Sequence, residues 1–348
     1  MLKYTLTIAD LRIETADAIT ICFKKTGLRQ IRYKPGQYIT LIFRINGRRF
    51  IRPYSFSSTP GIDGNLEVTV KRVQGGIVSN HIFDKVRIGD LIEVMEPMGD
   101  FIINDSFLSD PDNQSIILWG VGSGITPLYS IIKFVLNNYK SKVTLVYGNK
   151  NHKTAIFSKQ LNDLQKTHTD RFHIHHFHTQ PFIIEDNPYV IHGRIKPAKV
   201  LAIMHKNNNL DHTHHYICGP SGLKTSVKEA LIGLNVPVNK IYSEDFELVK
   251  DEREFTDIHT QDVHIQYEKI RTKVEVIKGK SILEAGLDSL IELPYSCQTG
   301  SCSVCKGKLI SGKIKEVGPT TRHPDLQPDE YLLCCSYPLT NNVEISVQ

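Results

Sequence analysis

The alternation of hydrophobic and polar positions divides the chain into blocks of different character. Residues 1–105 contain short alternating runs, for example 38–43 and 66–70, separated by Pro-Gly, Asn-Gly and Asp-Gly-Asn turn signals. Short strands at regular spacing with turns between them are typical of a closed antiparallel barrel. We therefore expect a β-barrel domain over residues 1–105.

The pattern changes in residues 106–246. An apolar run at 115–119 leads into a glycine-rich turn, then a helix-like stretch, then a second strand-like run at 143–147. Strands that alternate with helices indicate βαβ units and a parallel sheet. This block is predicted to be an α/β domain of the nucleotide-binding kind.

Residues 247–259 are rich in charge without clear periodicity, and we expect a linker there. Residues 260–348 then show two strand-like runs, a short helix-like run at 281–286 and a cysteine-rich loop. At 348 residues the chain is too long for one ordinary core, so a multi-domain protein is expected.

Composition excludes several classes of protein. With 40% hydrophobic and 23% charged residues the chain is typical of a globular protein. It has no apolar run of about 18 residues, so no transmembrane segment is expected. The first residues alternate like a strand rather than a secretion signal, which favours a cytoplasmic location. The net charge of +5 is not gathered into a basic stripe, so no nucleic-acid partner is expected.

The cysteines carry the clearest chemistry. Cys297, Cys302 and Cys305, with one of the adjacent pair Cys334 and Cys335, follow the C-x4-C-x2-C…C spacing of plant-type [2Fe–2S] sites. Four thiolates suit such a cluster, and small residues between the ligands let backbone N–H groups approach the sulfurs. A structural zinc site and unrelated buried thiols are the alternatives, but zinc sites usually show shorter spacings. Spacing alone does not choose the fourth ligand.

The predicted barrel domain contains a short string that resembles a known family motif. The string consists of Arg52, Pro53, Tyr54 and Ser55. This string resembles the R-x-Y-S flavin motif of the ferredoxin reductase superfamily, whose members bind FAD, or less often FMN, on a Greek-key barrel. On a strand the arginine and the tyrosine point to one face, where a cation can meet a phosphate and a ring can stack on the flavin. The resemblance implies that Ser55 lies near flavin N5.

A second segment contains Gly75, Gly76 and Ser79. It resembles the G-x-x-S segment of the same superfamily, in which backbone donors at a helix start hold the FAD pyrophosphate. This resemblance favours FAD over FMN.

The α/β block carries two further superfamily motifs. A glycine-rich string resembling G-x-G-x-T-P follows the first strand, at the place where a nicotinamide pyrophosphate meets a helix N-terminus. A later string resembles C-G-P, which implies a cysteine beside the nicotinamide carbon that gives up hydride. The residues concerned are Gly120, Gly122, Gly124, Thr126 and Pro127 in the first string, and Cys218, Gly219 and Pro220 in the second.

Together the motifs cover nearly the whole chain, in the order found in reductase components of bacterial oxygenases, most closely those of phenylacetyl-CoA oxygenases. The resemblance implies a C-terminal β-grasp ferredoxin domain, and the string around Cys334 resembles L-T-C-x-x-Y-P, which places the fourth ligand there. Electrons would pass from NAD(P)H through FAD and the [2Fe–2S] cluster to a protein acceptor, with Ser55 and Cys218 near the hydride transfer.

Several alternatives remain open. The acceptor could be a membrane fatty-acid desaturase, or the protein could be a redox sensor without turnover. Basic residues at Lys150 and Lys153 favour NADPH over NADH, since they could hold a 2′-phosphate. Trp119, before the glycine turn, could pack in a core or narrow the cofactor cleft. The histidine-rich runs at 173–178 and 212–215 are expected to form a solvated surface rather than a metal site.

Overall fold

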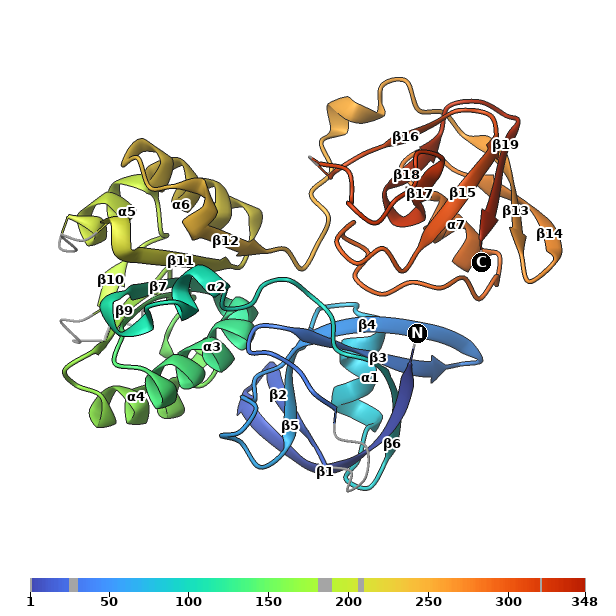
Figure 1. Ribbon diagram of the computed structural model, residues 1–348. Coiled ribbons are helices and arrows are strands. Elements are labelled where there is room, and N and C mark those ends of the chain that lie inside the picture. The colour runs from blue at the N-terminus through green and yellow to red at the C-terminus, as the bar shows by residue number, and fades with distance from the viewer. Residues whose placement is uncertain (1, 25–30, 181–189, 206–209, 320, 348) are drawn as a thin grey trace. The chain divides into compact units, whose positions relative to one another are not determined.

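The computed structural model describes residues 2–24, 31–180, 190–205, 210–319 and 321–347. Its residues form two compact units, which are described separately. The first unit contains residues 1–41 and 54–245, and the second contains residues 42–53 and 246–348. The described residues build four sheets, two of six strands, one of five and one of two. Figure 1 draws the strands as arrows.

The N-terminal part forms an antiparallel six-stranded sheet with the order β4-β3-β6-β1-β2-β5. The run predicted at 38–43 belongs to β3 and the run at 66–70 belongs to β5. Strands β2 and β5 are buried almost throughout, as expected for the wall of a barrel. The elements are β1 (Lys3–Thr15), β2 (Ala18–Phe23), β3 (Tyr38–Ile45), β4 (Arg48–Ser55), β5 (Leu66–Lys71), α1 (Ile77–Lys85) and β6 (Leu91–Met95).

The middle part is a parallel six-stranded sheet with the order β10-β9-β8-β7-β11-β12. Helices cover both of its faces (Figure 1). Its elements are α2 (Asp105–Leu108), β7 (Ser115–Val121), α3 (Ile125–Asn138), β8 (Lys142–Asn149), α4 (Ser158–Thr167), β9 (Phe172–His178), β10 (Val190–His192), α5 (Pro197–Met204), β11 (Thr213–Cys218), α6 (Ser221–Gly233) and β12 (Ile241–Glu244).

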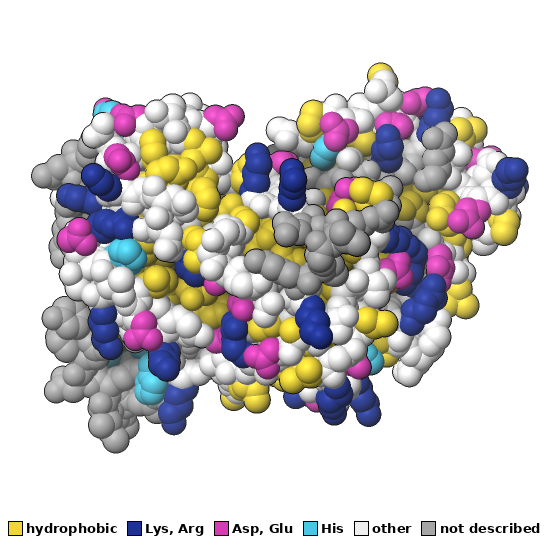
Figure 2. Space-filling model, turned by 60° about the horizontal axis from the view of Figure 1, so that its bottom comes forward, with side chains coloured by type: hydrophobic (Ala, Val, Ile, Leu, Met, Phe, Trp, Pro, Cys, Tyr) yellow, Lys and Arg dark blue, Asp and Glu magenta, His cyan; other side chains and the backbone are white. Residues whose placement is uncertain are grey.

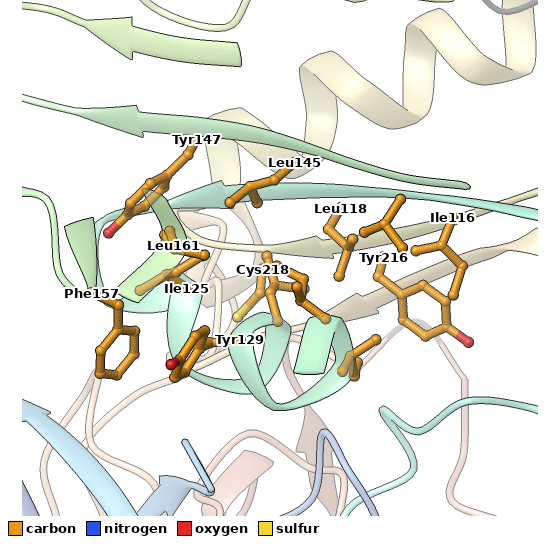
Figure 3. Close-up of a cluster of buried hydrophobic side chains, with 14 of the residues drawn as sticks. Ile116, Leu118, Ile125, Tyr129, Leu145, Tyr147, Phe157, Leu161, Tyr216 and Cys218 are labelled. Carbon is orange, nitrogen blue, oxygen red and sulfur yellow. The ribbon is translucent and has the colours of Figure 1, made fainter. Parts of the chain in front are cut away.

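Two apolar cores hold this sheet. One contains residues of β7, β8 and β11 together with α3 and α4, and Figure 3 shows ten of its side chains labelled. The other packs α5 and α6 against the opposite face and contains Trp119, which is fully buried. Trp119 is therefore a packing residue, the first of the two roles considered for it.

The histidines on this sheet correct one expectation. His178, His214 and His215 are buried, not part of a solvated surface. His214 and His215 lie on β11, between β7 and β12, and His178 lies on β9, between β8 and β10, in a sheet with helices on both faces. Trp119 Nε1 donates a hydrogen bond to His215 Nδ1 (3.3 Å). Burial lowers the pKa of His214 to about 4 and that of His215 to about 3, since a charged imidazole loses its hydration there. His173 is exposed, as expected.

The C-terminal part is a mixed five-stranded sheet with the order β14-β13-β19-β15-β17 and one helix packed on it. Strand β19 pairs in parallel with β13 and antiparallel with β15, so it joins the two halves of the sheet. The elements are β13 (Gln261–Tyr267), β14 (Ile270–Val276), α7 (Ile282–Asp288), β15 (Lys306–Ser311), β16 (Ile314–Glu316), β17 (Glu330–Leu332), β18 (Ser336–Pro338) and β19 (Val343–Val347).

The segment predicted to be a linker packs against the small β16–β18 sheet and helix α7 within the second unit. Ile258 is buried in a small core with Val317 and Tyr337, and Lys250 lies 3.6 Å from a Glu284 carboxylate oxygen. A 3₁₀ turn spans Glu252–Phe255. These contacts hold the segment against the second unit, and its role as a linker stays a prediction.

Candidate cofactor sites

The R-x-Y-S string lies at the end of strand β4. Ser55 is buried, and the three residues before it are partly exposed, so the strand presents a surface that a ligand can reach. Arg52 Nη1 donates to its neighbour's carbonyl, Ile51 O (2.8 Å). The arginine and the tyrosine at position 54 are two residues apart on β4, so their side chains leave the strand on the same face.

The loop that follows this string is clamped to helix α3 within the first unit. Ser130 Oγ donates to Ser58 O (2.6 Å), and Thr59 Oγ1 donates to Ser130 O (3.0 Å). Lys133 Nζ lies 2.5 Å from Asp63 Oδ2, and burial lowers the pKa of this lysine while the carboxylate opposes that shift. The loop beside the flavin string and the helix after the glycine turn are therefore fixed to each other. Nothing in the local sequence pattern signals this clamp.

The G-x-x-S string builds the start of helix α1. Gly75 has a φ of +72°, and Gly76 is the N-cap residue. Within the described residues no side chain caps this helix, so its first N–H groups are available to an anion. Ser79 Oγ accepts from Val73 N (3.1 Å) and would lie 2.6 Å from a β-carbon at position 76. The turn is thus shaped around a glycine, as expected for a pyrophosphate cradle.

The G-x-G-x-T-P string forms the connection from β7 to α3. A 3₁₀ turn spans Gly122–Gly124, and helix α3 starts at Ile125, so Pro127 lies in its first turn. Thr126 Oγ1 donates to Ser123 O (2.8 Å) and holds that turn closed. A β-carbon at Gly120 would lie 2.9 Å from a Leu128 methyl group. The glycine positions therefore let helix α3 approach the strand end closely.

The structure brings this string to the C-G-P string. A β-carbon at Gly124 would lie 2.1 Å from Cys218 O and 2.9 Å from Gly219 N, so only glycine fits there. The carboxyl ends of the adjacent strands β7 and β11 meet at this point. Ligands of open α/β sheets bind outside the carboxyl ends of the strands, and this is where the sequence predicts the nicotinamide nucleotide.

The Cys218 side chain itself is less accessible than its predicted role requires. It is 1% exposed and belongs to the apolar core under helix α3, as Figure 3 shows. Burial raises the pKa of its thiol well above the usual range, so the group is neutral at physiological pH. Its place beside a nicotinamide carbon stays a prediction. Gly219 is partly exposed and Pro220 is exposed.

The residues considered for a 2′-phosphate follow strand β8. Lys150 and Lys153 are exposed, and Asn151 and Thr154 form reciprocal capping hydrogen bonds across the short 3₁₀ turn between them. The turn holds the segment in a defined conformation at the same carboxyl edge of the sheet as the glycine string. Two exposed cations therefore lie at this edge of the sheet, and their contact with a 2′-phosphate stays a prediction.

The cluster loop has an unusual backbone. Gln298, Gly300 and Ser303 all have φ between +51° and +82°, a region that non-glycine residues rarely adopt. Such conformations turn successive N–H groups toward the loop interior. Accordingly, Thr299 N donates to Cys297 Sγ, and Cys297 N donates to Cys302 Sγ, each at 3.4 Å. The backbone strain at this loop is the kind that concentrates at functional sites.

The four predicted ligands form two pairs. The Cys302 thiol interacts with Cys297, lowering the pKa of Cys297 to about 4 and raising that of Cys302. Cys305 and Cys334 form the second pair, and Cys334 is the main cause of the raised pKa of Cys305. Across the described residues no three His, Cys, Asp or Glu side chains converge on a position for one metal ion. Two pairs of thiols fit a two-iron cluster, which is held by four cysteines.

Cys335 lies beside this arrangement. Its Sγ is 3.5 Å from Cys334 Sγ, and the side chain is fully buried. A β-carbon at Gly300 would lie 3.0 Å from this sulfur, so Cys335 packs beneath the loop. Cys334 as the fourth ligand, with Cys335 as its buried neighbour, stays a prediction.

Charge is interspersed on the molecular surface. On the face drawn in Figure 2, Lys and Arg side chains are scattered among Asp and Glu side chains. In the described part of the chain no helix is both long and apolar enough to cross a membrane.

Comparison with known proteins decides the family. The profile of the oxidoreductase FAD-binding domain matches residues 6–103, that of the oxidoreductase NAD-binding domain matches 118–229, and that of the 2Fe-2S iron-sulfur cluster binding domain matches 265–339. The chain belongs to the three-domain ferredoxin reductase superfamily. These matches also bear out FAD, a nicotinamide nucleotide and a [2Fe–2S] cluster as its cofactors, and the predicted fold class.

Relatives match along almost their full length. One component of the 1,2-phenylacetyl-CoA epoxidase of Escherichia coli is 29% identical, over 98% of this chain and 97% of that protein. The ferredoxin reductase component of the 3-ketosteroid-9-alpha-monooxygenase of Rhodococcus rhodochrous is also 29% identical, over 98% and 95%. Among solved structures, phthalate dioxygenase reductase has the same fold, with a TM-score of 0.67 at 22% identity over 99% of this chain and 98% of that one.

Proposed function

We propose that this protein is the reductase component of an oxygenase system, which takes a hydride from NADPH and delivers single electrons to an oxygenase protein. The observation that carries the proposal is the presence of all three binding domains, in order, on one chain. Its relatives over nearly the whole length include components of oxygenase systems named for phenylacetyl-CoA and for ketosteroids. An oxygenase of the phenylacetyl-CoA type is the first acceptor to test.

The order of the three cofactors follows from the number of electrons that each one transfers. A nicotinamide gives two electrons as hydride, an iron–sulfur cluster accepts one, and a flavin exchanges electrons in either number, so it belongs between them. Hydride transfer needs no general base, so the chain's contribution is placement. We assign no acid–base pair.

Named residues would hold each group. On β4, Arg52, Pro53 and Tyr54 would hold the flavin and its phosphate, and Ser55 would lie near its reactive edge. The uncapped start of α1, at Gly75, Gly76 and Ser79, would take the pyrophosphate. The clamp between Asp63 and Lys133 fixes this flavin-side loop to helix α3.

The nicotinamide nucleotide would lie where the two glycine-containing strings meet. Gly124 approaches Cys218 closely, and Gly219 and Pro220 are at least partly exposed, so their backbone would be free to face the nicotinamide. The rest of the first string, Gly120, Gly122, Thr126 and Pro127, supplies the turn and the helix start at its pyrophosphate. Exposed Lys150 and Lys153 support NADPH as the donor.

The cluster would be held by the two thiol pairs, Cys297 with Cys302 and Cys305 with Cys334. Backbone N–H groups already directed at these sulfurs would stabilise negative charge on them. All seven cysteines are free thiols, which is expected of a protein from a reducing compartment, and we place the protein in the cytoplasm.

The test is a visible absorption spectrum of the anaerobically purified protein before and after NADPH or NADH, with cytochrome c as an artificial acceptor. Flavin and cluster bands should both bleach, cytochrome c should be reduced steadily, and NADPH should act at lower concentration than NADH. Flavin and cluster absorption bands that do not change on addition of either nucleotide would refute the reductase proposal and favour a sensor. A protein that contains zinc and shows no cluster absorption would refute the proposed electron path.

A further inference from the structure

The turn that precedes the first cluster cysteine is held by strand β4, within the second unit. Arg49 Nη2 donates to two consecutive carbonyl oxygens of this turn, Glu292 O (2.6 Å) and Leu293 O (2.8 Å). The N–H of Ile51 donates to the phenolic oxygen of Tyr295 (3.0 Å). Strand β4 lies at one end of the strand order of its sheet, and Tyr295 thus takes up a backbone donor that an edge strand leaves unpaired.

These contacts are shielded from water. Ile51 and Leu293 are fully buried, Tyr295 is 2% exposed, and the Arg49 side chain is 14% exposed. Hydrogen bonds from a charged donor in such a setting are about twice as strong as neutral ones. By contrast, the ion pair of Arg44 with Glu292 is largely exposed and contributes little.

The turn is equally fixed on its other side. Leu293 packs against helix α7 so closely that a β-carbon at Gly286 would lie 2.6 Å from a Leu293 methyl group. Cys297 follows Tyr295 by two residues. Loss of the hydrogen bonds from β4 to this turn would therefore allow the start of the cluster loop to move.

Strand β4 also carries the flavin string, since Arg52 follows Ile51 directly and donates back to its carbonyl oxygen (2.8 Å). We infer that Arg49 and Tyr295 are positioning residues for the electron transfer from flavin to cluster. They join the strand that binds one redox group to the turn that leads to the other. The inference rests on the proposed function.

The electrons balance over two such transfers. Each one removes a single electron from the reduced flavin and reduces one ferric iron of the cluster to ferrous iron. Two transfers, with re-oxidation of the cluster by the protein acceptor in between, consume the electron pair of one hydride, and the flavin releases its proton to solvent.

The experiment compares full-length, cofactor-loaded Tyr295→Phe and Arg49→Gln variants with the wild type. Tyr295→Phe keeps the buried ring and removes the acceptor of the Ile51 N–H, and Arg49→Gln removes the charge that bridges two carbonyls. The matched control is Arg271→Gln, because Arg271 makes a bidentate ion pair with Glu344 away from the cluster loop in the same domain.

Two readouts are needed. Anaerobic stopped-flow absorption resolves flavin reduction by NADPH from subsequent cluster reduction, and amide hydrogen exchange reports the protection of the Ile51 N–H. The loss of one such hydrogen bond is worth about a factor of ten in the population in which β4 holds the turn. We therefore expect cluster reduction to slow about tenfold in Tyr295→Phe, which loses one bond, and at least about tenfold in Arg49→Gln, which loses two. Flavin reduction and cluster content should not change, and Ile51 should exchange faster in Tyr295→Phe. Arg49→Lys should recover part of the rate, and Arg271→Gln should match the wild type.

The outcomes separate the inference from the proposed function. Variants that reduce the cluster at the wild-type rate would overturn the positioning role, whether or not Ile51 exchanges faster. Equal slowing of flavin reduction and cluster reduction would also overturn it, since a general structural defect affects both. A wild-type protein whose flavin is not reduced by either nucleotide would overturn the proposed function and this inference with it.

Discussion

Replacing Gly124 by alanine tests whether the glycine turn and the C-G-P string meet as the structure has them. The new β-carbon would lie 2.1 Å from Cys218 O, and β-carbons essentially never come within 3.0 Å of a heavy atom of this kind. The two backbone segments must therefore separate by about 1 Å in a closely packed region. Overpacking of this kind costs about 1–3 kcal/mol of unfolding free energy. The backbone at Gly124 has φ −61°, so the cost comes from the contact and not from the conformation.

Separation of the two segments should also displace the bound nicotinamide. A displacement of about 1 Å in a positioned reactant can cost on the order of 100-fold in rate. We expect Gly124→Ala to lower the melting temperature and to slow flavin reduction by NADPH sharply, both measured on the flavin-loaded protein. Cluster reduction by a chemical reductant such as dithionite should be unaffected, because the cluster loop is not involved.

The matched control is Gly222→Ala in helix α6. No heavy atom lies within 4 Å of a β-carbon there, and alanine favours a helix over glycine by about 1 kcal/mol. This variant should be as stable as the wild type or slightly more so, with normal flavin reduction. A Gly124→Ala protein with wild-type stability and wild-type flavin reduction would refute the close approach of the two strings.

The remaining predictions concern other parts of the chain. Cys334→Ser should abolish the cluster absorption while flavin remains bound, and Cys335→Ser should retain it; the reverse result in iron and spectral analysis would move the fourth ligand. Changing Lys150 and Lys153 together to Glu should raise the KM for NADPH by at least tenfold and leave that for NADH nearly unchanged, and equal effects on both nucleotides would count against a 2′-phosphate site. His214 is neutral when folded, with a pKa of about 4, and titrates near 6.5 when unfolded, so protons bind the unfolded chain preferentially between these values. The free energy of unfolding should therefore fall by about 2 kcal/mol from this residue as the pH drops from 7 to 5. In His214→Gln the unfolding free energy, measured by denaturant titration at each pH, should depend less on pH over that range.

Local patterns predicted most of the elements. The runs at 38–43, 66–70, 115–119 and 143–147 are parts of strands, and the run at 281–286 overlaps helix α7. These predictions succeed because periodicity and turn residues are encoded within a few positions. Three of the four predicted cluster ligands also lie within nine residues, so their spacing alone was informative.

The features that were missed depend on distant neighbours. The burial of His214 and His215 follows from the central place of β11 in the sheet, which no local pattern reveals. The contact of Gly124 with Cys218 and the clamp of Lys133 with Asp63 join segments far apart in the chain. A glycine or a lysine gives no local sign of such a partner.

The place of β19 in its sheet bears on how the protein matures. Strands β13 and β15 each hydrogen-bond to β19, which comes later in the sequence than every other strand of that sheet and later than all four predicted ligands. During synthesis, domains generally fold as units as they emerge. The first two domains can therefore fold while the C-terminal sheet still lacks its joining strand. Iron and sulfide would be loaded last, onto a chain whose flavin and nicotinamide domains are already complete.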